Sequence, residues 1–227
     1  MPRGAYEVTS AMVAYHGETK GYLATSVNQP NAPGVIMIHE WWGLNAHIKD
    51  AANKLASHGY SVLAVDMYNG TVAANATIAR GLSSSVTMEG AIANLADANA
   101  YLRNSGSEKV ASLGYCFGGG QSMNLGISSV PVDASVVYYG SLKTALADPE
   151  KVHAPLLLIY GTADTVTPLA DAQELQTTLQ SMGAPVELYS YEGLGHAFAN
   201  PSNAGHDKNA TRDAWDKTLL FLAKQLN

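Results

Sequence analysis

The hydrophobic and polar positions along the chain predict short strands that alternate with longer helices. Continuous apolar runs, typical of strands buried on both faces of a parallel sheet, recur through the sequence. Runs of this character cover residues 35–38, 61–65, 109–113, 132–139, 155–160 and 186–191. Helical patterns lie between or after them, at residues 48–58, 88–103, 169–182 and 212–226. This alternation predicts an α/β architecture.

The two ends of the chain add detail to this architecture. Residues 6–15 and 21–27, joined by residues 16–20, indicate an opening antiparallel pair of strands. The last helical segment carries one apolar face, formed by Trp215, Leu219, Leu222 and Leu226. We expect an α/β three-layer sandwich whose mostly parallel sheet has an antiparallel start, folded as a single domain over residues 1–227.

Two segments lack a regular pattern. Residues 69–87 are rich in glycine, serine, alanine and asparagine, and they fit a loop, a broken helix or a short lid. Residues 200–210 indicate a second polar loop.

Composition and charge exclude several classes of protein. The chain has 13 Lys and Arg against 19 Asp and Glu, and this net charge of −6 argues against nucleic-acid binding. Its one cysteine excludes an internal disulfide and a multi-cysteine metal site. The first thirty residues contain no apolar segment typical of a signal peptide, and no apolar run approaches the roughly 20 residues that span a bilayer. We expect a cytoplasmic monomer or homodimer without membrane or nucleic-acid partners.

The sharpest local signal is the sequence GYCFGG at residues 114–119, which follows a predicted strand and precedes a helix-compatible segment at 120–126. It has the form of a nucleophile elbow, with Cys116 in the nucleophile position. Glycines relieve the crowding at such a sharp turn, and the helix N-terminus favours a thiolate. The alternative is a small, buried and unreactive cysteine.

Two further residues complete a catalytic order. Elbow hydrolases place the nucleophile, the acid and the histidine in that sequence along the chain. Asp164 follows the strand predicted at 155–160, and His196 follows the strand predicted at 186–191. Strand ends of this kind meet ligands in parallel sheets, which predicts His196 as a base oriented by Asp164. Alternatively, Asp164 caps the next helix and His196 bonds to backbone.

A fourth motif, HEWWGLN at residues 39–45, ends the first buried strand. In elbow hydrolases the loop at this place supplies a backbone N–H to the oxyanion hole, and the residue after the nucleophile, here Phe117, supplies another. Glu40 needs a separate explanation, because a carboxylate repels an oxyanion. It either points to solvent or pairs with Lys49, or it interacts with the Cys116 thiol.

Together, the cysteine elbow, Asp164 and His196 in order, and the H-E-x-x-G motif that begins at His39 resemble the dienelactone hydrolase family of the α/β-hydrolase fold. The resemblance covers nearly the whole chain. It implies that Cys116 forms a thioester acyl-enzyme, that His196 is the base and that Asp164 orients the histidine.

The resemblance also implies roles around the nucleophile. Glu40 would contact the resting thiol and take its proton when substrate displaces the carboxylate. Trp41 and Phe117 would donate backbone N–H groups to the oxyanion. A thiolate that forms only when substrate is bound would protect a lone, oxidisable cysteine.

The chain differs from the family at the positions that bind the carboxylate of the substrate. Members that act on dienelactone hold this group with two arginines, whereas the matching positions here are Asn69 and Asn200. A charge-assisted hydrogen bond contributes about 1.5–3 kcal/mol. We therefore expect a preference for neutral short-chain or aryl esters over anionic dienelactone, unless Arg80 replaces the missing cations.

Aromatic residues near the catalytic positions indicate an apolar pocket wall suited to neutral acyl or aryl groups. The candidates for substrate binding are Trp42, Tyr68 and Phe198, with Trp41 and Tyr139 beside them. Alternatively, some of these rings are ordinary core aromatics. The chain shows no H-E-x-x-H or comparable ligand spacing, so no metal or cofactor is expected.

Two functions other than ester hydrolysis stay open. A neutral, open pocket with a Cys–His–Asp set could accept organophosphate triesters, because an oxyanion hole can also hold a phosphoryl oxygen. The chain could instead be a non-catalytic protein that binds a small ligand or responds to redox state through its lone thiol. An ordered acid and base argue against the second alternative.

Overall fold

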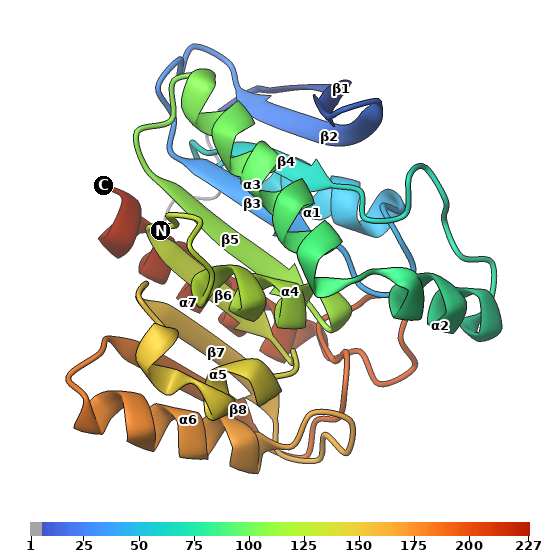
Figure 1. The fold of residues 1–227 in the computed structure, drawn as a ribbon. Coiled ribbons are helices and arrows are strands. Elements are labelled where there is room, and N and C mark those ends of the chain that lie inside the picture. The colour runs from blue at the N-terminus through green and yellow to red at the C-terminus, as the bar shows by residue number, and fades with distance from the viewer. Residues whose placement is uncertain (1–5) are drawn as a thin grey trace. The chain divides into compact units, whose positions relative to one another are not determined.

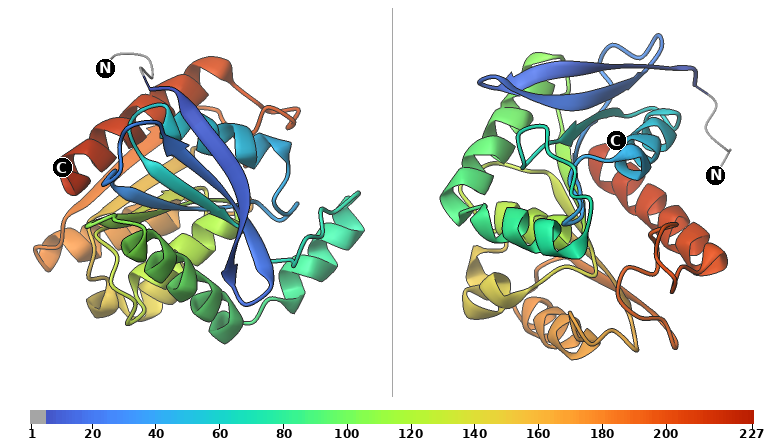
Figure 2. Two further views of the ribbon diagram at one scale, coloured as in Figure 1. Left: turned by 90° about the horizontal axis from the view of Figure 1, so that it is seen from above. Right: turned by 90° about the vertical axis from the view of Figure 1, so that its right-hand side faces the viewer.

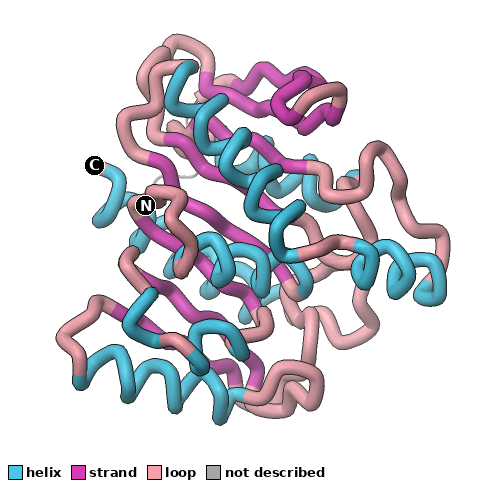
Figure 3. Tube along the Cα trace, in the orientation of Figure 1, coloured by secondary structure: helices cyan, strands magenta, loops and turns pink. Residues whose placement is uncertain are grey.

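The computed structural model describes residues 6–227, in which strands and helices alternate along the chain (Figures 1 and 3). The chain divides into two compact units, one ending at Ser112 and the other beginning at Leu113. Strand β5 (Val110–Tyr115) contributes residues to both. The α/β architecture predicted from the sequence is confirmed, and a single domain over residues 1–227 stays a prediction.

The first unit contains the antiparallel start. Its strands β1 (Val8–His16), β2 (Thr19–Ser26), β3 (Gly34–Ile38) and β4 (Ser61–Val65) lie in the order β1-β2-β4-β3. The pairs β1–β2 and β2–β4 are antiparallel, whereas β3 and β4 are parallel. Helices α1 (Ala46–Ala56) and α3 (Met88–Asn104) cover opposite faces of these strands (Figure 2).

The second unit is parallel throughout its described pairs. Strands β6 (Ala134–Tyr138), β7 (Leu156–Gly161) and β8 (Val186–Tyr191) follow one another side by side. Helices α4 (Phe117–Gly126), α5 (Lys143–Ala147) and α6 (Leu169–Ser181) lie on one face, and a 3-10 turn covers Pro149–Lys151. Helix α7 (Lys208–Leu226) lies on the other face, which gives this unit three layers (Figure 2).

Burial follows the apolar runs, with one exception. Every residue of β3, β4, β5, β6 and β7 is buried, as the continuous apolar runs predict. Strand β8 is only half-buried, so the expectation that it resembles the others is wrong. Its sequence VELYSY carries Glu187 and Ser190, and it pairs with β7 as the last strand of the sheet order.

Helix α7 shows how a local cap moves a boundary. The predicted apolar face is confirmed, because Trp215, Leu219, Leu222 and Leu226 are all buried. The helix begins four residues before the predicted residue 212, since the Asp207 carboxylate accepts the Ala210 N–H at 2.8 Å and caps the first turn. The polar loop predicted at 200–210 is correspondingly shorter.

The irregular segment 69–87 contains helix α2 (Ala76–Ser85). The helix begins where the Asn75 side chain accepts the Ile78 N–H at 3.0 Å. Ala79 is its one buried residue, so the helix packs weakly on the rest of its unit. The structure thus shows a short helix between two loops, and whether this segment forms a lid stays a prediction.

Candidate active site

Cys116 lies in the tight turn between β5 and α4. Its φ of 53° is in the left-handed region, which a non-glycine residue rarely adopts. The turn is possible because its neighbours are glycines: a Cβ on Gly114 would overlap the Gly118 carbonyl. The Cys116 N–H donates to the Tyr138 carbonyl at 3.0 Å, which fixes the elbow against the end of β6. The half-buried thiol therefore lies at the N-terminus of α4, as predicted.

His196 follows β8 and reaches this thiol. Its Nε2 lies 3.0 Å from the Cys116 Sγ. The Asn203 side chain donates to the carbonyls of His196 and Ala197, at 2.8 and 3.2 Å, and so fixes the loop that carries the imidazole. The Tyr139 ring packs edge-on against the imidazole, with the ring centres 5.3 Å apart. The imidazole is thus held by both its loop and its neighbours.

Asp164 orients the other side of the imidazole. Its Oδ2 lies 2.8 Å from the His196 Nδ1, and its side chain is fully buried. Its Oδ1 accepts the backbone N–H groups of Val166 and Thr167, at 2.8 and 2.9 Å. Helix α6 begins only at Leu169, so Asp164 accepts turn N–H groups and does not cap that helix.

The electrostatics of this relay follow from its contacts. Burial alone would raise the pKa of the Asp164 carboxyl, but hydrogen bonds from His196, Thr167 and the Val166 backbone lower it below its usual value. Burial also opposes an imidazolium, yet the contacts with Asp164 and Cys116 raise the pKa of His196 to about 10. The thiolate is the nucleophilic form of a cysteine, and the His196 Nε2 lies close enough to the sulfur to take its proton. Sulfur, imidazole and carboxylate thus form the arrangement of a nucleophile, a base and an orienting acid.

The motif at the end of β3 is held by a histidine whose structural role the sequence analysis missed. The His39 Nε2 accepts the Met67 N–H at 3.1 Å, so its Nδ1 carries the proton and donates to the Glu40 carbonyl at 2.6 Å. Burial lowers the pKa of His39, which keeps the ring neutral in this role. The Tyr68 ring packs edge-on against it at 4.7 Å. His39 therefore ties the turn after β3 to the segment after β4.

The remaining predicted residues of the first unit differ in exposure. Glu40 is buried, with 3% of the residue exposed, which excludes the solvent-pointing alternative. Trp41 and Trp42 are half-buried and pack edge-on, with their ring centres 5.1 Å apart. Tyr68 is buried, and Arg80 is exposed on α2. The roles of these residues toward substrate stay predictions.

Two predicted substrate residues of the second unit are buried. Phe198 has 0% exposure and packs against the Tyr139 and Tyr191 rings, at 5.6 and 5.1 Å between centres. This packing favours the alternative of a core aromatic for Phe198. Asn200 is also buried, and its Oδ1 accepts the Ser202 N–H at 2.8 Å. Asn200 therefore shapes the loop after His196.

Sequence reasoning missed two residues that hold the relay, Thr167 and Asn203. The Thr167 hydroxyl donates to Asp164, and the Asn203 amide supports the His196 loop. Thr167 lies three residues after Asp164, a spacing that suits turn contacts with the carboxylate. For Asn203, nothing in the polar loop distinguishes it from its neighbours.

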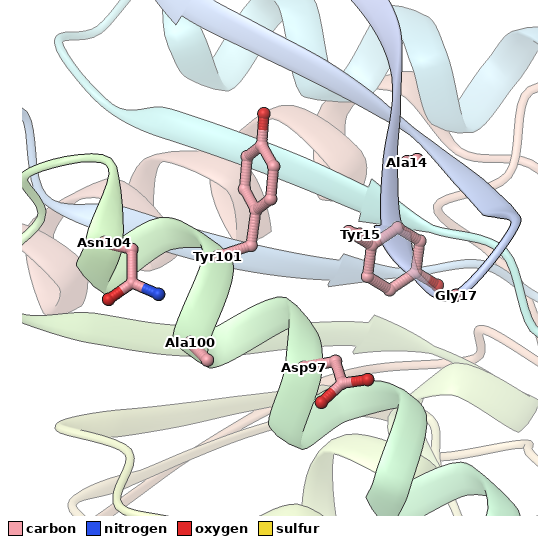
Figure 4. Close-up of a pocket in the computed structure, with 7 residues that line it drawn as sticks. All are labelled: Ala14, Tyr15, Gly17, Asp97, Ala100, Tyr101 and Asn104. Carbon is pink, nitrogen blue, oxygen red and sulfur yellow. The ribbon is translucent and has the colours of Figure 1, made fainter.

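A separate surface pocket of about 390 Å³ lies in the first unit, between the end of β1 and α3 (Figure 4). Beside it the His16 Nδ1 and Asp97 Oδ2 form an exposed pair at 2.7 Å. Its lining contains no predicted site residue and consists of Ala14, Tyr15, Gly17, Asp97, Ala100, Tyr101 and Asn104. The pocket is therefore not the candidate active site.

Two further properties concern residues 6–227 as a whole. Within this part of the chain, no three His, Cys, Asp or Glu side chains are grouped so that they could hold a metal ion. In the same residues, no helix combines the length and the apolar character needed to cross a membrane.

Comparisons with known proteins identify the family of this chain. Residues 19–226 match the sequence profile described as the dienelactone hydrolase family. A Saccharolobus solfataricus protein, provisionally named a carboxymethylenebutenolidase, is 30% identical over 90% of this chain and 93% of its own. The carboxymethylenebutenolidase of Pseudomonas putida is 29% identical over 92% of this chain and 93% of its own. A crystal structure from Klebsiella pneumoniae, provisionally named a dienelactone hydrolase, has a TM-score of 0.84 at 23% identity and covers 97% of this chain and 99% of that one.

Proposed function

The chain belongs to the dienelactone hydrolase family, and we propose that it hydrolyses neutral carboxylic esters through a thioester on Cys116. The observation that carries this proposal is the relay from sulfur to imidazole to carboxylate, with distances of 3.0 and 2.8 Å. The family supports the class of reaction, which is ester or lactone hydrolysis. The substrate preference and the roles of the individual residues are our proposal.

In the first half-reaction, the Cys116 sulfur attacks the ester carbonyl carbon. The family resemblance gives the thiol proton to Glu40, whereas we assign it to the His196 Nε2, which lies 3.0 Å from the sulfur. Asp164 stabilises the resulting imidazolium through Nδ1. The C–O bond to the alcohol then breaks, and the imidazolium gives its proton to the departing oxygen. The products of this step are the free alcohol and a thioester on Cys116.

In the second half-reaction, water cleaves the thioester. The neutral His196 takes a proton from water as the oxygen attacks the acyl carbon. The C–S bond breaks, the carboxylic acid leaves, and the proton returns to the imidazole–sulfur pair. His196 thus gives up one proton in the first half-reaction and takes one from water in the second.

Developing negative charge on the carbonyl oxygen needs hydrogen-bond donors. Phe117 is the first residue of α4, and its backbone N–H lies at the positive end of that helix. We assign it, together with the Trp41 N–H that the family resemblance implies, to the oxyanion hole. Preorganised donors of this kind contribute several kcal/mol to catalysis.

The preference for neutral substrates rests on two uncharged positions. Asn69 and Asn200 stand where dienelactone-cleaving relatives carry arginines, and Asn200 is buried and occupied with its own loop. A substrate carboxylate would lose two charge-assisted bonds of about 1.5–3 kcal/mol each. Arg80 is exposed on α2, and we assign it no contact with substrate.

Turnover of a neutral short-chain aryl ester and of an anionic dienelactone, measured side by side, tests this proposal. We expect kcat/KM for the neutral ester to exceed that for the lactone by about 10-fold or more. Cys116→Ala is the control and should abolish both activities. A lactone that is turned over faster would contradict the specificity proposal, and no turnover of either would contradict the ester hydrolase itself.

The alternatives have their own readouts in the same assay. A phosphotriester turned over beyond one equivalent would add the organophosphate activity, whereas a single equivalent would mean that the enzyme is only inhibited. A protein that merely binds a ligand or senses oxidants needs no ordered base, so the relay favours catalysis over that alternative.

A further inference from the structure

The Thr167 hydroxyl contacts the same carboxylate oxygen that His196 uses. The Thr167 Oγ1 donates to the Asp164 Oδ2 at 2.8 Å, and the His196 Nδ1 lies 2.8 Å from that oxygen. The hydroxyl also lies 3.2 Å from the Tyr139 carbonyl and 3.4 Å from the His196 Nδ1. It therefore sits where the segments that follow β6, β7 and β8 meet.

We propose that Thr167 is a positioning residue that shares Oδ2 of Asp164 with His196 and thereby moderates how tightly the imidazole holds its proton. This inference rests on the proposed function, in which His196 gives up a proton in the first half-reaction and takes one in the second.

The Thr167 hydroxyl affects how strongly His196 binds its proton and not where the Asp164 carboxylate lies, because other groups already hold that carboxylate in place. The backbone N–H groups of Val166 and Thr167 both donate to Oδ1, and these bonds do not depend on the Thr167 side chain. Oδ2 is left with two donors, the hydroxyl and the imidazole. Removal of the hydroxyl leaves Oδ2 to His196 while the carboxylate keeps its orientation.

The Thr167 hydroxyl donates to Oδ2 of Asp164 and stabilises the negative charge of that carboxylate. The carboxylate then stabilises the His196 imidazolium less strongly. Without that donor, His196 binds its proton more tightly. Proton transfer is most effective when the pKa of the base lies near the operating pH. The pKa of His196 is already raised, so a further increase would slow proton transfer from its imidazolium. The hydroxyl of Thr167 therefore favours turnover near neutral pH.

The test measures the His196 ring directly. The titratable groups that contact His196 in the second unit are Cys116, Asp164 and Tyr139, so a Cys116→Ala background removes the thiol and isolates the carboxylate. In this background, the ring protons of His196 are followed by NMR against pH and assigned by their loss in His196→Gln. We expect Thr167→Val to raise the midpoint by about 0.5–1 pH unit.

Two control variants separate the hydroxyl from the shape of the loop. Thr167→Ser keeps the donor and should restore the original midpoint. Thr165→Val makes the same change at an exposed position of the same turn and should leave the midpoint unchanged. If Thr167→Val does not fold, Thr167→Ala removes the same donor and carries the measurement.

With Cys116 present, we expect Thr167→Val to lower kcat for the aryl ester about 3-fold and leave KM unchanged. An unchanged or lowered NMR midpoint would overturn this inference, whatever the activity. A wild-type protein without ester turnover would instead overturn the proposed function, and the midpoint would still report on Thr167.

Discussion

At the scale of single residues, the site depends on a cysteine whose backbone and side chain are both constrained. The left-handed φ of Cys116 is held by a backbone hydrogen bond to β6, and its sulfur is held 3.0 Å from an imidazole. Strained conformations of this kind persist only where the surroundings over-determine them. The strained backbone conformation of Cys116 therefore supports a functional role for its thiol.

The reactivity of Cys116 should depend on His196. The pKa of His196 is raised to about 10, so the imidazolium persists across neutral pH and is lost only as the pH rises toward that value. We expect iodoacetamide to label Cys116 rapidly at pH 7, and His196→Ala to slow this labelling about 10-fold or more.

His153→Ala provides a matched control for this experiment, because His153 is exposed in the loop before β7 and should not affect labelling. Labelling that is equally fast in His196→Ala would favour the redox-responsive thiol over the catalytic set.

Sequence analysis identified the site residues that belong to a recognisable motif or order along the chain, and it missed those that do not. The elbow motif and the order of Asp164 and His196 along the chain predicted an arrangement that the distances now show. Thr167 and Asn203 were missed because threonine and asparagine are ordinary in loops. Their contacts exist only once the segments after β7 and β8 are brought together.

At the scale of elements, strand ends place the site and glycines allow it. The nucleophile follows β5, the acid follows β7 and the histidine follows β8. Gly119 and Gly140 permit the close approach of α4 to the segment after β6, since a Cβ on Gly119 would lie 2.7 Å from the Tyr138 carbonyl. The fully buried strands were predicted because continuous apolar runs are distinctive.

Elements without such a pattern were predicted less well. Helix α2 buries only Ala79 and contains Gly81 and three serines, which hid it within an irregular segment, and its start depends on the Asn75 side chain. Strand β8 was expected to be fully buried, although its polar residues suit a strand with a neighbour on one side only. The formation of α2 and the partial burial of β8 therefore depend on tertiary packing and on position in the sheet, which the local sequence does not show.

At the scale of the whole molecule, the two units share strand β5. Val110 and Ala111 belong to the first unit, and Gly114 and Tyr115 belong to the second. Because the boundary between the units falls inside one strand, we expect the two units to unfold together. The sequence predicts one domain for the same length of chain.

Unfolding in urea tests the prediction of one domain. The three tryptophans divide between the units, with Trp41 and Trp42 in the first and Trp215 in the second. In Trp215→Phe, and separately in a Trp41→Phe and Trp42→Phe double variant, we expect the fluorescence midpoint to coincide with the circular dichroism midpoint. A fluorescence midpoint well below that of circular dichroism in either variant would indicate two domains that unfold separately.

The most direct test of the central claim is the mass of the intact protein during turnover of a neutral aryl ester. Rapid acid quenching should trap a species heavier by one acyl group, and fragmentation should place that group on Cys116. The species should be absent from Cys116→Ala and should accumulate in His196→Ala far more slowly than in the wild type. Ester turnover without this species, or an acyl group on any other residue, would contradict the account.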